Sequence, residues 1–130
     1  MPQSQSVSVA ETAEVSREAV VTKALCRAAE QLGLGQGHLA AVIGLSTASV
    51  SRMHKGQYLL NLESKEGELA LVLLRIFRSL DTIVGGDAKA LKAWFHAQNT
   101  HLDGVPAELV KRARGLFSVS EYLDAMRGAL

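Results

Sequence analysis

Residues 38–56 constrain the fold more than any other stretch, because they have the pattern of two short helices joined by a tight turn. Leu39 and Ile43 stand one helical turn apart and define the apolar face of the first helix. Gly44 follows directly, where such a turn requires a positive φ angle. The first helix is therefore expected to end at Ile43.

The second helix of this pair is expected to run from about Thr47 to His54. Ser46 or Thr47 can cap it, because a short hydroxyl side chain can accept a hydrogen bond from an unpaired amide of the first turn. Val50 and Met53 return to the core at a spacing of three residues. The stretch as a whole predicts a helix-turn-helix.

The outer face of the second helix carries short polar side chains and a guanidinium group. Such groups can bond base edges and phosphates in the major groove of DNA. The predicted DNA-contacting residues are Ser46, Thr47, Ala48, Ser49, Ser51, Arg52 and Lys55. Read from the residues alone, the alternative is a tight corner inside another kind of helical domain.

The net charge of the chain is only +1 over 130 residues and does not by itself indicate a nucleic-acid partner. The distribution of the charged residues along the chain does. No Asp or Glu occurs from Gln31 to Leu62, whereas Arg52 and Lys55 lie in this window. A phosphate-facing surface has this character, because carboxylates would repel the DNA backbone. Chance in a weakly charged chain is the alternative explanation.

The rest of the chain predicts an all-α fold without a sheet. Helical periods and their stops divide it into a flexible start over residues 1–12, helices over about 15–32 and 64–80, and further helices after Asp87, from Pro106, and over 118–129. Gly115 is expected to end one helix, and Ser118 to Glu121 to form the capping box of the last. In terms of domains, residues 13–62 form the DNA-binding region and residues 63–130 a second helical domain.

The helix over residues 64–80 has an apolar arc wider than one small domain normally covers. It is either central in the fold or part of a dimer interface. The predicted dimer-interface residues are Leu69, Leu73, Ile76 and Leu80. A two-fold dimer would set two recognition helices about 34 Å apart, as two half-sites of an operator require.

Two sets of residues resemble known families. The first set resembles the helix-turn-helix of Xre/Cro repressors and comprises Ala40, Ile43, Gly44, Leu45, Val50 and Met53. The second set resembles the toxin-binding domain of Xre/MbcA/ParS antitoxins and comprises Trp94, Asn99, Leu102, Gly104, Pro106, Leu109 and Gly115, followed by a terminal helix. Together the two resemblances cover about residues 35–130.

The resemblance implies a RES-domain toxin that consumes NAD as the protein partner, and the promoter of the chain's own operon as the DNA partner. It also implies that the carboxyl-terminal domain silences the toxin. The predicted toxin-binding residues are Phe117, Tyr122, Met126 and Arg127. The alternative is that Val119, Tyr122, Leu123 and Met126 only pack on the helix of Trp94.

Neither catalysis nor a cofactor is expected. Cys26 is the only cysteine, so the chain can form no internal disulfide and no cysteine-based zinc cluster. His96 and His101 lack the one-turn spacing of a helical metal pair. Without a secretory or membrane-spanning run, a bacterial cytoplasmic location is expected. The open functional alternatives are a stand-alone dimeric repressor and a ParS-like adaptor.

Overall fold

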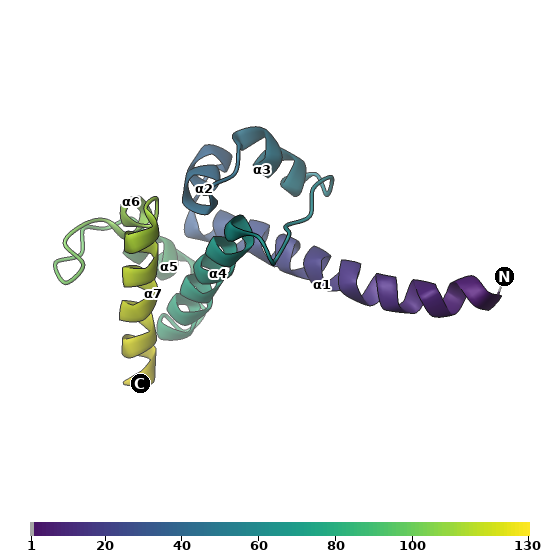
Figure 1. Cartoon of the computed structure of the whole chain (residues 1–130). Coiled ribbons are helices and arrows are strands. Elements are labelled where there is room, and N and C mark those ends of the chain that lie inside the picture. The colour runs from purple at the N-terminus through teal and green to yellow at the C-terminus, as the bar shows by residue number, and fades with distance from the viewer. Residues whose placement is uncertain (1) are drawn as a thin grey trace.

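A computed structural model describes the backbone of residues 2–130 and the side chains of residues 17–130. In this part of the chain the fold is all-helical, as predicted, and contains no strand; one isolated bridge pairs Asn99 with Gly104 (Figure 1). The helices are α1 (Pro2–Leu32), α2 (Gln36–Ile43), α3 (Thr47–His54), α4 (Lys65–Ile83), α5 (Ala88–Phe95), α6 (Pro106–Leu109) and α7 (Ala113–Gly128).

Helix α1 begins much earlier than the sequence indicated. It starts at Pro2 rather than near Val15, and its first part extends beyond the other helices (Figure 1). Residues 2–12, which were expected to be a flexible start without a helical period, are therefore helical. The physical reason is that residues 3–32 contain neither glycine nor proline, so no residue interrupts the helix once it has begun.

Helix α4 is the centre of the fold, since it packs against α1, α2, α5 and α7. Ser64 caps it by accepting a hydrogen bond from the amide of Gly67 at 3.1 Å. A side chain at Gly67 would collide with the carbonyl oxygen of Asn61, so glycine allows the preceding connector to cross close to the helix.

The central position of α4 corrects the predicted dimer interface. Leu73, Ile76 and Leu80 are each 0 % exposed, and Leu69 is half-buried against the same core. The chain's own helices cover Leu73, Ile76 and Leu80, so these three side chains are not available to a second copy. The wide apolar arc reflects a helix enclosed by its own chain, which was the other interpretation of the pattern.

Helix α7 begins at Ala113, five residues before the predicted capping box. Gly115 does not end a helix but lies in the first turn of α7, and Ser118 to Glu121 are interior to it. A side chain at Gly115 would overlap the carbonyl oxygen of Leu109. Glycine is therefore present because the backbone of α6 passes too close for a Cβ atom.

Asp124 joins α7 to α4. Its carboxylate accepts hydrogen bonds from the Arg75 side chain at 2.9 Å and from the Ser79 hydroxyl at 3.2 Å. Arg127 approaches the same carboxylate at 3.6 Å. Ser79 is completely buried, so this bond satisfies a hydroxyl that water cannot reach.

Two histidines connect the helix-turn-helix half with the carboxyl-terminal half. Nε2 of His38, on α2, lies 2.6 Å from the carbonyl oxygen of Ala107 on α6. Nε2 of His96, just after α5, lies 2.7 Å from the carbonyl oxygen of Leu32 at the end of α1. Because a carbonyl oxygen only accepts, each Nε2 must carry the proton.

Candidate functional site

Helices α2 and α3 form the predicted helix-turn-helix. Gly44 ends α2 with a φ angle of 78°, the left-handed conformation that the turn requires. Ser46 caps α3, and its side chain accepts a hydrogen bond from the amide of Ser49 at 3.1 Å. Val50 and Met53 are buried against the core, at 0 % and 4 % exposure. The predicted bounds of α3 are confirmed.

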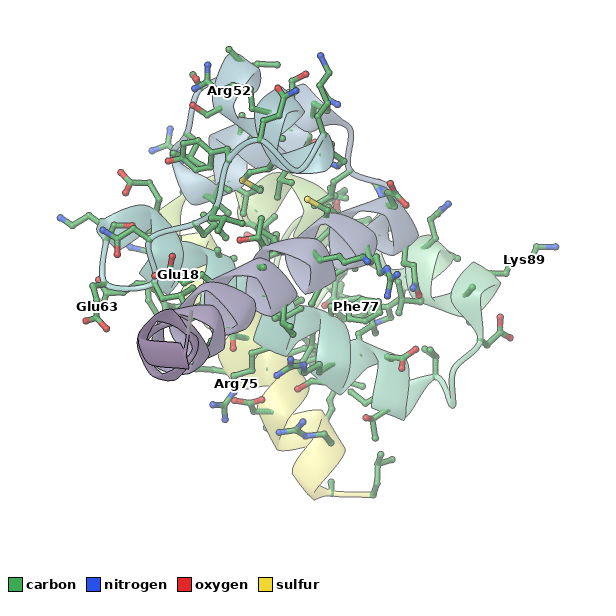
Figure 2. The ribbon with its side chains drawn as sticks, turned by 90° about the vertical axis from the view of Figure 1, so that its right-hand side faces the viewer. Glu18, Arg52, Glu63, Arg75, Phe77 and Lys89 are labelled. Carbon is green, nitrogen blue, oxygen red and sulfur yellow. The ribbon has the colours of Figure 1, made fainter. Side chains whose placement is uncertain are left out.

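The residues predicted to contact DNA lie on α3 or at its two caps, and none of them belongs to its buried pair. Ser46, Thr47, Ala48, Arg52 and Lys55 are exposed, and Ser49 and Ser51 are half-buried. Figure 2 shows Arg52 at the outer edge of the helix-turn-helix, apart from Arg75 on α4. The surface is therefore a short polar helix face with two cations at its carboxyl-terminal end.

The guanidinium of Arg52 is oriented by two neighbours. Its Nη2 donates to the hydroxyl of Ser49 at 3.2 Å, and its Cζ lies 5.9 Å from the ring centroid of Tyr58. The latter distance is that of a cation–π contact. Ser49 thus positions Arg52 in addition to lying on the same face.

Tyr58 is the residue of this site that the sequence analysis missed, because it lies in the connector after α3. The chain turns back there, and the amide of Gln57 donates to the carbonyl oxygen of Arg52 at 2.8 Å. The only sequence signal for this contact was an aromatic residue six positions after Arg52. That signal becomes informative only once the turn of the chain after α3 is known.

The four residues predicted to bind a toxin have different environments on α7. Phe117 is 46 % exposed and presents its ring to solvent. Tyr122 is half-buried, with its ring centroid 6.3 Å from that of Trp94 at an interplanar angle of 15°. Met126 is half-buried against the core, and Arg127 lies beside Asp124. For Tyr122, the structure therefore agrees with the alternative interpretation, in which this side chain packs on Trp94.

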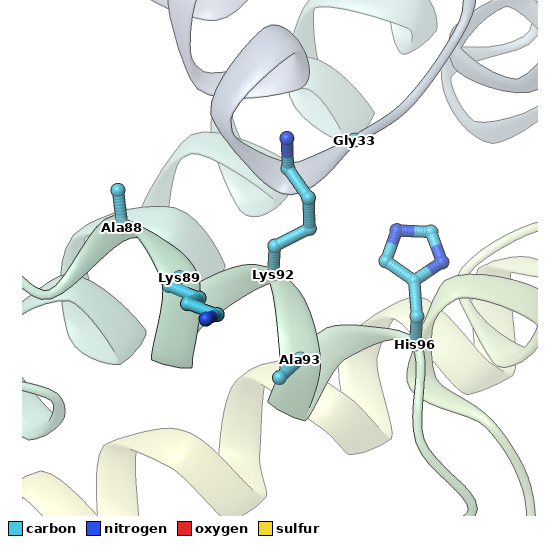
Figure 3. A pocket seen from close by; sticks show the side chains of 6 residues that line it. All are labelled: Gly33, Ala88, Lys89, Lys92, Ala93 and His96. Atoms are coloured by element: carbon cyan, nitrogen blue, oxygen red, sulfur yellow. The ribbon is translucent and has the colours of Figure 1, made fainter.

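A basic hollow of about 730 Å³ lies between the end of α1 and α5 (Figure 3). Its lining residues are Gly33, Ala88, Lys89, Lys92, Ala93 and His96. A Cβ atom at Gly33 would lie 3.0 Å from Nε2 of His96. Its polar side chains are two lysines and a histidine, and Nε2 of that histidine is already bonded to the carbonyl oxygen of Leu32.

Among residues 17–130, no group of three or more His, Cys, Asp or Glu side chains could hold a metal ion. Burial raises the pKa of the Cys26 thiol, and the negative charge of Glu30 raises it further. Within the same part of the chain, every helix is too short or too polar to cross a membrane.

Comparison with protein families identifies both halves. Residues 11–75 match the family described as antitoxin Xre-like helix-turn-helix domain, and residues 79–129 match the family described as antitoxin Xre/MbcA/ParS C-terminal toxin-binding domain. The two ranges meet within α4. A comparison with curated proteins gave no match. The chain therefore belongs to the Xre-like antitoxins, with a DNA-binding helix-turn-helix followed by a toxin-binding domain.

Proposed function

We propose that this antitoxin neutralises a RES-domain toxin that consumes NAD, and that it represses its own operon in the bacterial cytoplasm. The observation that carries the proposal is the presence of both matched domains, in this order, on one chain. No catalytic role is proposed for the antitoxin itself. It acts by binding, so the toxin would lose activity when the carboxyl-terminal half covers it.

For DNA binding, α3 enters the major groove of the operator with its exposed face. Ser46, Thr47, Ala48, Ser51 and Lys55 face the DNA together with Arg52 and Ser49. A guanidinium held by Ser49 and Tyr58 loses less conformational freedom on binding than a freely rotating one. Arg52 is therefore the residue proposed to read a base, and Lys55 the residue proposed to contact a phosphate.

The repressor is proposed to act as a homodimer, because one helix-turn-helix reads only one half-site. With Leu73, Ile76 and Leu80 enclosed, α4 offers a second copy only its outer side, where Leu71 is 40 % exposed. Leu71→Asp is expected to weaken dimerisation without unfolding the chain. Sedimentation of this variant and the parent at micromolar concentration measures the effect, and unchanged dimerisation would place the interface elsewhere.

The test of toxin neutralisation is co-expression with the RES-type toxin encoded beside the antitoxin. Induction of the toxin alone is expected to stop growth and to deplete cellular NAD, and co-expression of the antitoxin is expected to restore both. Persistent NAD depletion would contradict neutralisation. A chain that binds operator DNA but not the toxin would be a stand-alone repressor, and one that binds neither would favour the ParS-like adaptor.

A further inference from the structure

A groove of about 440 Å³ lies beside the first turn of α7, in the toxin-binding half of the chain. Its lining combines three apolar side chains, Leu102, Val105 and Leu109, with two cations, Arg112 and Arg114, and one carboxylate, Glu108. We propose that this groove is where the toxin docks, and that it receives a toxin segment carrying an aliphatic side chain next to an Asp or Glu carboxylate. The inference rests on the proposed toxin-binding function and names its surface.

The walls of the groove are held in place by close backbone approaches. A Cβ atom at Gly104 would lie 2.9 Å from Cδ2 of Leu109, and one at Gly115 would overlap the carbonyl oxygen of the same leucine. Asn99 and Gly104 exchange backbone hydrogen bonds of 2.9 and 3.2 Å, which close the loop that carries Leu102. A groove built in this way needs little rearrangement to bind, so little ordering entropy opposes docking.

The charge beside the groove selects an acidic partner. Lys111 is occupied by Glu108, with 2.9 Å between Nζ and Oε1, and this hydrogen bond lowers the pKa of Glu108. Arg112 and Arg114 are exposed and form no salt bridge with the side chains of residues 17–130. Two guanidinium groups at the rim of an apolar groove suit a carboxylate, which each can bind with two parallel hydrogen bonds.

The occupant is a protein segment rather than DNA, because a phosphodiester has no aliphatic group to fill the apolar wall. Phe117 extends the contact surface, since it is exposed one helical turn beyond Arg114. Aromatic residues and arginines are enriched in the binding hot spots of protein interfaces, so an exposed phenylalanine next to an arginine-lined groove fits a docking surface. A second copy of this chain is the competing occupant, and the experiment separates the two.

The experiment measures binding of the full-length antitoxin to the toxin encoded beside it, used as a catalytically inactive variant, by titration calorimetry. Arg112→Glu combined with Arg114→Glu reverses the charge at the rim, and Ser118→Trp fills the groove from an exposed position. Each is expected to weaken toxin binding by about tenfold or more. Ala125→Trp, at another exposed position of α7, is the matched control and is expected to bind within about twofold of the parent.

Operator binding by each variant shows whether the chain remains folded, and it is expected to be unchanged. If the parent does not bind the toxin, the proposed function is wrong and not only the groove. If the parent binds and both groove variants bind equally well, the groove inference is overturned. If Ser118→Trp weakens toxin binding but the double charge reversal does not, the proposed contact with a carboxylate is overturned. If the groove variants lose self-association but still bind the toxin, the groove is occupied by a second copy of the chain.

Discussion

Arg52 is the side chain for which the structure predicts the largest effect on DNA recognition. Arg52→Ala is expected to cost about 1–3 kcal/mol of operator binding if the guanidinium reads a guanine. Tyr58→Leu keeps the guanidinium but removes the ring 5.9 Å from it, so a smaller loss is expected. Fluorescence anisotropy with operator and scrambled duplexes measures both. Equal binding by Arg52→Ala and the parent at matched salt would show that α3 reads through other residues.

Lys55 provides the contrasting prediction at the same scale, because a phosphate contact carries no sequence information. Lys55→Ala is expected to weaken operator and scrambled DNA by similar factors. The slope of log affinity against log salt is expected to fall by about one per binding site. A selective loss of operator binding would instead make Lys55 a base-reading residue.

Cys26 is expected to react slowly, because burial and then Glu30 raise its pKa. The thiolate is the reactive form, so at pH 8 the folded chain should hold less of it than an ordinary cysteine. Alkylation by iodoacetamide, followed by mass spectrometry, is expected to be about tenfold slower or more in the folded chain than in denaturant. Equal rates would mean that the site opens to solvent easily.

At the scale of single elements, two glycines of α7 form a matched pair. Gly115→Ala places a methyl group against the carbonyl oxygen of Leu109 and is expected to destabilise the fold by about 1–3 kcal/mol. Gly128→Ala meets no atom within 4 Å and is expected to be neutral, or stabilising by up to about 1 kcal/mol. Urea unfolding of both variants measures the difference, and equal stabilities would mean that α6 can move aside.

The junction of α4 and α7 allows a double-mutant test. Asp124→Ala leaves the buried hydroxyl of Ser79 without its acceptor, at an expected cost of about 1–3 kcal/mol. Adding Ser79→Ala removes that hydroxyl, so the double variant should lose less than the sum of the single losses. Additive losses in urea unfolding would show that the Ser79–Asp124 bond contributes nothing. Deleting residues 118–130 would not test this junction, because Val119 and Leu123 are 0 % exposed and their loss would disrupt the core.

For the whole molecule, the expected behaviour is unfolding as one unit. Both matched families share α4, and the bonds from His38 to Ala107 and from His96 to Leu32 tie the halves together. Loss of tryptophan fluorescence, which reports Trp94 in the second half, should therefore coincide with loss of helical circular dichroism. His38→Ala should lower the midpoint, and a separate Trp94 transition in the parent would show two independent domains.

The sequence by itself determined those features that depend on neighbouring residues. The turn at Gly44, the cap at Ser46 and the bounds of α3 were all predictable, because each depends on backbone preferences within a few residues. The order of the two domains was also predictable, since their motifs are local in sequence.

Only the tertiary structure decided which apolar and glycine residues serve which purpose. Periodicity shows that Leu73 and Ile76 need burial, but not whether the same chain or a second copy supplies it. Gly115 was expected to end a helix and instead accommodates the carbonyl of Leu109. Tyr58 gained its role from a turn of the chain, and the groove beside Arg112 exists only where α6, α7 and the loop before them meet. Such outcomes depend on contacts between segments distant in sequence, which no local pattern encodes.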